Sequence, residues 1–170
     1  MTAPSRNTVF VRRARIADLG AVERLNRELQ DYERRLRRSR RPGHAMPASY
    51  LEKLLHKDKL NTGRVFVATS ATGVIGFLAC AIESNVLELD ANRVYISDLV
   101  VSVSWRRRGV AAALVSAAKR FAHEKRIRWL EISALARNTA ARRAYLALGF
   151  RESTLTFERR SAPGPRRRGQ

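Results

Sequence analysis

Apolar residues recur every three or four positions near the start of the chain, at Val22, Leu25, Leu29, Tyr32 and Leu36. This spacing gives a helix one apolar face and predicts a long helix over about residues 18–38. Asp18 is expected to cap its start, because a carboxylate can accept from the free N–H groups of a first helical turn. The arginine-rich end followed by Pro42-Gly43 is typical of a helix terminus.

Further along the chain the apolar period falls to two, which is the period of a strand. The predicted strands, in chain order, are residues 9–12, Val65–Thr69, Val74–Glu83, Val94–Val103, Trp129–Leu135 and Phe150–Glu158. Ser70 to Gly73 is predicted to form a hairpin turn. Helical spacing is found after Pro47, after Gly109, and around Ala144 up to Gly149.

This order of elements predicts an α/β fold with a partly antiparallel sheet. The 170 residues suit one domain, which we expect at residues 8–160, with residues 161–170 as a disordered basic tail. We find no run long enough for a membrane-spanning helix and no signal-peptide pattern, so we expect a soluble, cytoplasmic protein with no membrane partner. The lone Cys80 excludes an internal disulfide framework, and it is expected to be a small buried side chain.

Charge is the most unusual feature of the composition. Lys and Arg number 34 against 15 Asp and Glu, for a net charge of +19. Such a field attracts polyanions, and we expect weak, non-specific nucleic-acid binding. No groove-reading motif accompanies it, so the alternative is an arginine-rich composition spread over solvated faces.

The stretch from Trp105 to Ala111 lies between a predicted strand and an amphipathic helix. The first N–H groups of such a helix and its dipole form an anion site. Gly109 allows close backbone approach, and Arg106–Arg108 add charged donors. The stretch therefore predicts a pyrophosphate cradle; the alternative is a basic turn that only starts a helix. The glycine-rich patterns of dinucleotide and ATP sites are absent from the sequence.

A second constellation begins at Asn138, which stands where a helix N-cap belongs. Tyr145 follows it by seven residues, two turns along the same helix face. Its phenol can point at the end of the sheet; the alternative is a packing tyrosine with a satisfied hydroxyl.

Taken together, the two stretches resemble the GNAT superfamily of N-acetyltransferases. The motifs are R-x-x-G-x-A from Arg106 and N-x-x-A-x-x-x-Y-x-x-x-G-F from Asn138, with a helix and a strand between them. The order of elements agrees from about Val9 to Glu158. The resemblance implies a mixed, mostly antiparallel central sheet, helices on both faces and a splayed pair of parallel strands. Ala111 departs from the glycine often found there, and its extra methyl group is compatible with cofactor binding.

The resemblance further implies acetyl-CoA as co-substrate, bound where the predicted strands Val94–Val103 and Trp129–Leu135 splay apart. Its pantetheine arm would pair with backbone groups of Val101 and Val103, and its pyrophosphate would lie on residues 106–111. A backbone N–H near Leu99–Val101 would stabilise the oxyanion. The residues expected to contact the cofactor are Leu99, Val101, Val103, Arg106, Arg107, Arg108, Gly109, Val110, Ala111, Asn138, Ala141 and Tyr145.

The implied reaction is direct acetyl transfer from the thioester to an amine, with Tyr145 as general acid for the departing thiolate. Asp98 and Glu131 are the leading candidate bases, Glu83 is another, and a water chain without a dedicated base is the alternative. In some relatives a glutamate precedes the motif asparagine by five residues. This chain has Ser133 there, and Glu131 lies two residues earlier.

The acceptor site is expected on the first two helices, with Glu28, Tyr32 and Tyr50 in its wall. The run from Arg34 to Arg41 is expected to repel polycationic acceptors such as aminoglycosides or histone tails, and to favour neutral, anionic or nucleic-acid-borne amines. The three histidines do not converge on the motifs, and we expect no metal.

The leading hypothesis is therefore an acetyl-CoA-dependent N-acetyltransferase acting on an amine of a small molecule, a peptide or a protein. The alternatives are a nucleic-acid-binding protein or an acyl-CoA sensor on the same fold, with transfer lost or secondary. The resemblance also implies a homodimer.

Overall fold

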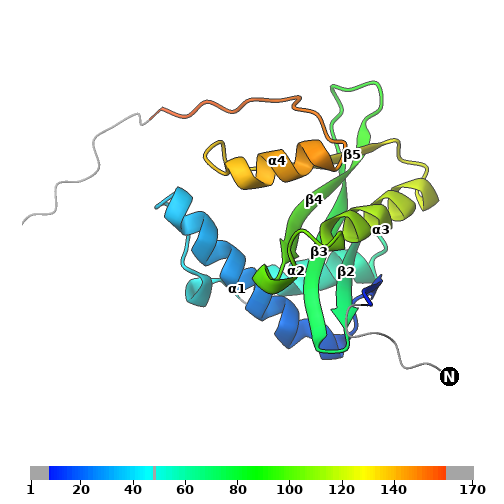
Figure 1. Cartoon of the computed structure of the whole chain (residues 1–170). Helices are drawn as coiled ribbons and strands as arrows, with labels where there is room; N and C mark the ends of the chain where they lie inside the picture. The colour runs from blue at the N-terminus through cyan, green and yellow to red at the C-terminus, as the bar shows by residue number, and fades with distance from the viewer. Residues whose placement is uncertain (1–7, 48, 160–170) are drawn as a thin grey trace, which may run out of the picture.

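The computed structural model describes residues 8–47 and 49–159 (Figure 1). Its strands are β1 (Phe10–Arg13), β2 (Gly63–Ser70), β3 (Gly73–Ser84), β4 (Asn92–Val101) and β5 (Trp129–Ile132). Its helices are α1 (Leu19–Leu36), α2 (Ser49–Lys59), α3 (Val110–Glu124) and α4 (Thr139–Ala147), with 3-10 turns at Ile16–Asp18, Gly43–Ala45 and Val103–Trp105.

The five strands form one sheet in the order β1-β2-β3-β4-β5. The first four are antiparallel to their neighbours, and β5 is parallel to β4. A parallel neighbour requires a crossover, and α3 supplies it between β4 and β5. The predicted fold class, a mixed and mostly antiparallel sheet, is confirmed. The predicted hairpin turn is also present, with Gly73 at a φ of 104°.

Helices cover both faces of this sheet, and each face has its own core. On one face Leu114 and Phe121 of α3 pack with Leu78 and Ile96. On the other, a cluster around Val22, Leu25 and Phe77 joins α1 to the sheet, with Leu51 and Leu54 of α2 at its margin. The apolar stripes read from the sequence for α1 and α3 are therefore the faces that these two helices bury.

A β-bulge divides β4 into two halves. Opposite β3, Ala79 pairs with Asp98 but Cys80 pairs with Ile96, which leaves Ser97 as the extra residue. One extra residue reverses the alternation of side chains. Simple alternation predicts that Ile96 and Leu99 point to opposite faces, whereas both lie on the α3 side. Val100 lies in the α1 core, and Asp98, two residues before it, points the same way.

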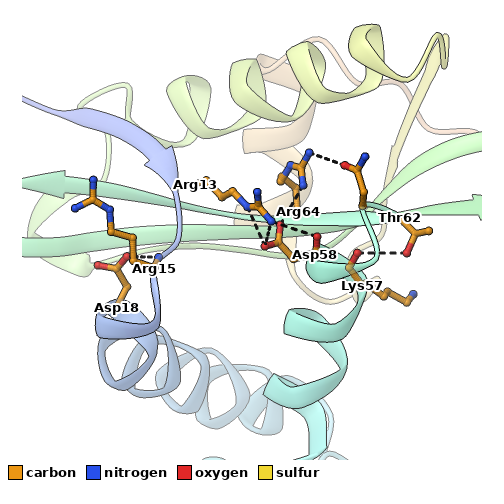
Figure 2. Close-up of polar contacts among 8 residues, drawn as sticks. Arg13, Arg15, Asp18, Lys57, Asp58, Thr62 and Arg64 are labelled. Carbon is orange, nitrogen blue, oxygen red and sulfur yellow. Dashed lines mark hydrogen bonds and ion pairs between the residues drawn. The ribbon is translucent and has the colours of Figure 1, made fainter.

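Ion pairs join β1, the end of α2 and the start of β2. Asp58, at the end of α2, accepts from Arg13 of β1 at 2.7 Å and from Arg64 of β2 at 3.4 Å (Figure 2). One carboxylate thus ties β1 to the consecutive elements α2 and β2, and the Thr62 hydroxyl donates to the Lys57 carbonyl oxygen beside it.

The prediction that the Asp18 side chain caps α1 by accepting from N–H groups of its first turn is wrong. Asp18 does precede α1, but its carboxylate accepts from the Arg15 N–H at 2.7 Å and from the Arg12 guanidinium at 2.6 and 2.9 Å. Its backbone is already helical, because a 3-10 turn runs into α1, and this aims the side chain back toward β1. The hydrogen bond from Arg12 lowers the pKa of Asp18.

Three strand predictions need correction. β4 ends at Val101 rather than Val103, because Val103–Trp105 turns toward α3. β5 ends at Ile132 rather than Leu135, where its pairing with β4 stops. Phe150–Glu158 is not a strand, since its backbone pairs with no strand within residues 8–47 and 49–159. The expected tail at 161–170 lies outside the described residues.

Candidate active site

The turn before α3 has the geometry of an anion site. The first hydrogen bond of α3 runs from the Ala113 N–H to the Gly109 carbonyl oxygen at 3.0 Å. The N–H groups of Val110, Ala111 and Ala112 therefore point out of the end of the helix. Gly109 has a φ of 77°, in the left-handed region that favours glycine. A phosphate at this end would meet three amides and the positive end of the helix dipole.

Three exposed arginines surround this turn. Arg106 donates from Nε to the Val101 carbonyl oxygen at 3.1 Å, so it braces the turn against the end of β4. Arg108 lies over the Trp105 ring at 5.2 Å from its centroid. Arg107 has a φ of 59°, and its exposed side chain adds positive charge beside the helix end. These contacts keep strong positive charge next to the amides.

Beyond the turn, β4 and β5 separate. Their pairing runs from Arg93 opposite Trp129 to Ile96 opposite Ile132 and then stops, while β4 continues to Val101. The half of β4 that follows the bulge therefore faces a gap where β5 would be. Leu99 and Val101 lie half-buried along this half. Its backbone groups on the gap side can pair with an extended ligand.

Asp98 lies at the bulge and is fully buried. Oδ1 accepts from Asn26 Nδ2 of α1 at 3.2 Å. Oδ2 accepts from Ser97 Oγ at 2.9 Å and from the Tyr50 hydroxyl of α2. Burial raises the pKa of the Asp98 carboxyl, against these hydrogen bonds, which favour its charged form. The carboxylate thus joins β4 to both helices of the α1 side.

Tyr145 projects from α4 toward the same region. Its ring contacts Phe150 at a centroid distance of 6.1 Å. Burial raises the pKa of its phenol to about 12, and the negative charges of Glu33, Tyr95 and Asp98 add to this. The phenol is therefore protonated at neutral pH and lies near two carboxylates.

Glu33 of α1 is one of these two carboxylates. Its side chain is 15% exposed and pairs with Arg40 at 2.9 Å. Burial raises the pKa of Glu33, while Arg40 opposes the shift and the charge of Asp98 adds to it. A carboxylate with a raised pKa beside a protonated phenol gives this site both a proton acceptor and a proton donor.

The start of α4 is held by Asn138, whose Oδ1 accepts from the Ala141 N–H at 3.0 Å. This is the predicted N-cap. The Tyr32 hydroxyl of α1 donates to the same oxygen at 3.4 Å, which joins the end of α1 to α4 (Figure 1). Glu28 lies one turn before Tyr32 on α1 and is exposed.

A cavity of about 170 Å³ opens on the sheet face away from α3. Its lining residues are Glu83, Ser84, Asn85, Arg93, Tyr95 and Glu131. Glu131 pairs with Arg93 at 2.9 Å, and the Tyr95 hydroxyl lies 2.7 Å from Ser133 Oγ. Tyr95 lines this cavity, and its charge is one of the causes that raise the pKa of Tyr145.

The structure therefore brings together most of the residues singled out in the sequence. Tyr145 and Asp98 converge, and the turn at 106–111 adjoins the gap. Val103 lies in the 3-10 turn, where its carbonyl oxygen accepts from the Arg106 N–H at 3.4 Å. Glu131 lies in the neighbouring cavity instead.

Sequence reasoning missed Glu33, Asn26 and Tyr95. Glu33 adjoins the Tyr32 of the apolar stripe, and its place in an arginine-rich run hid it. Asn26 was detectable as a polar residue directly after the apolar Leu25, on the buried side of α1. Tyr95 carried no signal beyond its place in a strand.

Within residues 8–47 and 49–159, no group of three or more His, Cys, Asp and Glu side chains could hold a metal ion. No helix in the same residues is long and apolar enough to span a membrane. Cys80 is buried, as predicted, and burial raises the pKa of its thiol to about 12.

Known proteins share both the sequence and the fold. The profile of the Acetyltransferase (GNAT) family matches residues 25–150. An aminoglycoside N(6')-acetyltransferase type 1 of Salmonella typhimurium is 30% identical over 136 residues, which cover 78% of this chain and 92% of that protein. An aminoglycoside N-acetyltransferase solved with CoA superposes with a TM-score of 0.71 at 23% identity, covering 95% of this chain and 100% of that one. A Bacillus halodurans transcriptional regulator gives a TM-score of 0.72 at 20% identity, covering 90% and 99%.

The gap between the parallel strands β4 and β5, with free amides and arginines at its end, has a shape and charge that suit an extended, phosphorylated ligand. The chain belongs to the Acetyltransferase (GNAT) family. It is an acetyl-CoA-dependent N-acetyltransferase, with acetyl-CoA as its co-substrate.

Proposed function

We propose that this enzyme acetylates a primary amine of a small, hydroxylated, cationic acceptor of the aminoglycoside type. The single observation that carries the proposal is the cavity lined by Tyr95, with the carboxylates of Glu83 and Glu131 in its wall. Carboxylates bind ammonium groups, while Tyr95, Ser84 and Asn85 offer hydrogen bonds to hydroxyl groups. The Salmonella typhimurium relative, an aminoglycoside N(6')-acetyltransferase, supports the same acceptor class.

The local charge differs from the charge of the whole chain. The run Arg34–Arg41 led us to expect repulsion of polycations. Several of these arginines have partners: Arg37 donates to Glu158 at 2.7 Å, Arg40 pairs with Glu33, and Arg34 donates to backbone carbonyl oxygens. The carboxylates of the cavity also have partners, Lys57 for Glu83 at 3.8 Å and Arg93 for Glu131 at 2.9 Å, so a cationic acceptor would bind by sharing or displacing these cations.

For the co-substrate, we propose that the amides of Val110–Ala112 and the arginines at 106–108 hold the pyrophosphate, and that Leu99 and Val101 offer backbone groups to the pantetheine arm. The gap between β4 and β5 and the left-handed Gly109 support this fit. Asn138 has its Oδ1 engaged by Ala141, so its amide nitrogen is the group left to contact the ligand. Ala141 and Val103 complete the proposed contacts at the rims of the gap.

In the transfer, a nitrogen–carbon bond forms to the acetyl carbonyl carbon, the carbon–sulfur bond breaks, the amine loses a proton and the sulfur gains one. We propose that Tyr145 donates to the departing sulfur. A phenol with a pKa of about 12 is fully protonated, but full transfer to a thiolate of ordinary pKa near ~8.5 is unfavourable. Tyr145 therefore acts chiefly by a hydrogen bond that strengthens as charge develops on sulfur.

The acceptor amine must lose its proton, and we propose Glu33 as the group that receives it, directly or through water. Its raised pKa and its position near Tyr145 support this role. Asp98 accepts from three donors and is better suited to holding α1 and α2 on β4. Glu131, paired with Arg93, is better suited to binding a second ammonium group of the acceptor.

The test is release of free thiol from acetyl-CoA with a panel of amines at low and high salt. The panel holds an aminoglycoside, a polyamine, a phosphorylated amino sugar and a peptide N-terminus. We expect the aminoglycoside to give the highest kcat/KM, and Glu131→Gln to raise its KM without changing the KM for acetyl-CoA. Glu124→Gln, at the exposed end of α3, is the matched control.

The same panel separates the alternatives. Preference for the phosphorylated amine, with no effect of Glu131→Gln, would contradict the acceptor class. Acetyl-CoA binding without thiol release for any amine would indicate an acyl-CoA sensor. Salt-sensitive RNA binding without acetyl-CoA binding would indicate a nucleic-acid-binding protein.

We extend the proposal to assembly and location. A homodimer acting in the cytoplasm, where acetyl-CoA is available, suits this activity. Weak, non-specific nucleic-acid binding is expected from the net charge of +19 and should weaken steeply with salt.

A further inference from the structure

A pair of hydroxyl groups lies at the point where β4 and β5 separate. The last paired residues of the two strands are Ile96 and Ile132. The Tyr95 hydroxyl of β4 lies 2.7 Å from Oγ of Ser133, the first residue after β5, and either oxygen can donate. We call this contact the clasp. It joins the two strands by side chains just beyond the end of their backbone pairing.

The clasp lies on the face of the sheet that carries the cavity. Ile96 and Ile132 pack on the α3 side, and side chains alternate along a strand, so Tyr95 and Ser133 project from the opposite face. Tyr95 and Glu131 are neighbours in register and both line the cavity, which agrees with this direction. The clasp therefore borders both the gap between the strands and the cavity proposed for the acceptor.

The direction of the gap places the acyl end of the carrier at the clasp. The anion site before α3 follows the far end of β4, at Val101, so the arm would run from there back along residues 97–101. These five residues of extended strand span about 16 Å, which suits an extended arm with two amide groups. This step rests on the proposed function, in which Leu99 and Val101 hold the pantetheine arm.

The acyl group must also face the side of the sheet on which the amine arrives. Glu33 belongs to α1, and Asp98 accepts from Asn26 of α1, so both carboxylates lie on the α1 side. The charges of Glu33, Tyr95 and Asp98 all raise the pKa of the Tyr145 phenol. The proposed acid and base thus lie on the face of the clasp, and the acyl group turns toward that face at the closed end of the gap.

We infer that the Tyr95 ring, held in place by Ser133, closes the end of the gap and limits the length of the acyl group that the enzyme transfers. An acetyl group places one methyl group against the ring, whereas a longer chain meets the ring or displaces it. One methylene in such a pocket changes selectivity by roughly 10–200-fold. The enzyme is therefore selective for acetyl-CoA over propionyl-CoA and butyryl-CoA.

The hydrogen bond to Ser133 fixes the position of this wall. Tyr95 is half-buried and Ser133 is exposed, so their bond contributes little to the stability of the fold. Without the bond, the ring is free to turn about its side-chain torsions toward solvent. Because the two hydroxyl groups share one bond, loss of either group has the same effect on the wall. Tyr95 is thus the specificity-determining residue, and Ser133 is its positioning residue.

The test measures binding of acetyl-CoA, propionyl-CoA and butyryl-CoA by calorimetry, which requires no acceptor. Wild type should bind acetyl-CoA at least about tenfold more tightly than butyryl-CoA, and Tyr95→Ala should bind the two with similar affinity. Tyr95→Phe and Ser133→Ala should each lose part of this selectivity. The double variant Tyr95→Phe/Ser133→Ala should lose no more than either single variant, because both changes remove one bond. The ratio of kcat/KM values for the three acyl-CoAs should follow the same order.

Two matched controls should keep the selectivity of wild type. Phe10→Ala removes an exposed aromatic ring from β1, at the other edge of the sheet, and Ser116→Ala removes an exposed hydroxyl group from α3. Circular dichroism and Tm check that every variant folds. If Tyr95→Ala does not fold, the comparison of Ser133→Ala with wild type decides the outcome.

Equal affinity of wild type for acetyl-CoA and butyryl-CoA would overturn the inference. So would full selectivity in Tyr95→Ala and Ser133→Ala, or a Tyr95→Ala variant in which only the KM for the amine changes, since Tyr95 would then belong to the acceptor cavity alone. Wild type that binds none of the three acyl-CoAs would instead contradict the proposed course of the pantetheine arm, so the two failures are distinguishable.

Discussion

Replacement of Asp98 tests whether its carboxylate holds the fold or takes the proton of the acceptor. Asp98→Ala removes the acceptor for Asn26 and Tyr50, while Ser97 keeps a second one, the Ala79 carbonyl oxygen at 3.3 Å. An unpaired buried donor costs about 1–3 kcal/mol, so two donors should lower the unfolding free energy by about 2–6 kcal/mol. At roughly 2–4 °C per kcal/mol for a domain of this size, Tm should fall by on the order of 10 °C.

Asp98→Asn is the matched variant. Its amide oxygen still accepts from Tyr50 and Ser97, and the Asn26 amide can turn to accept from the new NH₂ group. The buried charge is gone, so stability at pH 7 should stay within about 1 kcal/mol of wild type. If Asp98 holds the helices, turnover should fall less than about tenfold; if it is the general base, loss of ~10²–10⁴-fold is expected.

Stability against pH gives a second readout. Burial raises the pKa of Asp98, so the folded chain keeps a proton that the unfolded chain releases near pH ~3.9. The stability gained by binding this proton is fully present below that pH and is lost as pH rises through the folded pKa. As pH rises through the folded pKa of Asp98, the unfolding free energy of wild type should therefore fall relative to that of Asp98→Asn. Thermal melts at several pH values measure stability, and initial rates at pH 7 measure turnover. If Asp98→Asn has a normal Tm but its turnover is reduced more than a hundredfold, Asp98 is the general base and does not merely hold the helices.

Three other variants probe the site. Tyr145→Phe should lower turnover by ~10–10³-fold and leave the affinity for acetyl-CoA, measured by calorimetry, unchanged. In wild type, deprotonation of this phenol should cause no loss of activity at pH values well below its pKa of about 12. Unchanged turnover in Tyr145→Phe would show that Tyr145 does not assist the departing sulfur. Gly109→Val should weaken acetyl-CoA binding at least tenfold, whereas Gly73→Val, at a φ of 104° in the distant hairpin, should cost a similar amount of stability and leave binding intact. Equal binding by the two glycine variants would contradict the cradle. Glu33→Gln should lower kcat/KM and abolish the acidic limb that the raised pKa of Glu33 sets in the pH profile; a retained limb would assign the base elsewhere.

The sequence was sufficient for features that depend on local pattern. The apolar stripe of α1 and the alternation in β2 and β3 report which side of each element is buried, because burial selects residue type at every turn or every second residue. The turn before α3 was equally local, since Gly109 and the arginines lie within four residues of one another.

Features that depend on partners distant in sequence were out of reach. The bulge at Ser97 arises from register against β3, and no residue type marks it. The role of Glu33 depends on α4 lying above it, more than a hundred residues later. Phe150–Glu158 shows the reverse case: a strand pattern is present, but a strand exists only where an edge is supplied.

Because Ser97 is an extra residue in β4, the fold depends at this position on the number of residues in the strand more than on their type. Exchange of the exposed Ser97 removes one hydrogen bond to Asp98, whereas its deletion would turn every later residue of the strand to the opposite face. Asp98 would then lie in the hydrophobic core beneath α3, and Leu99 would face α1 and α2, whose side chains now bind the Asp98 carboxylate. We therefore expect natural variation here to consist of substitutions, with insertions and deletions excluded between Ile96 and Asp98.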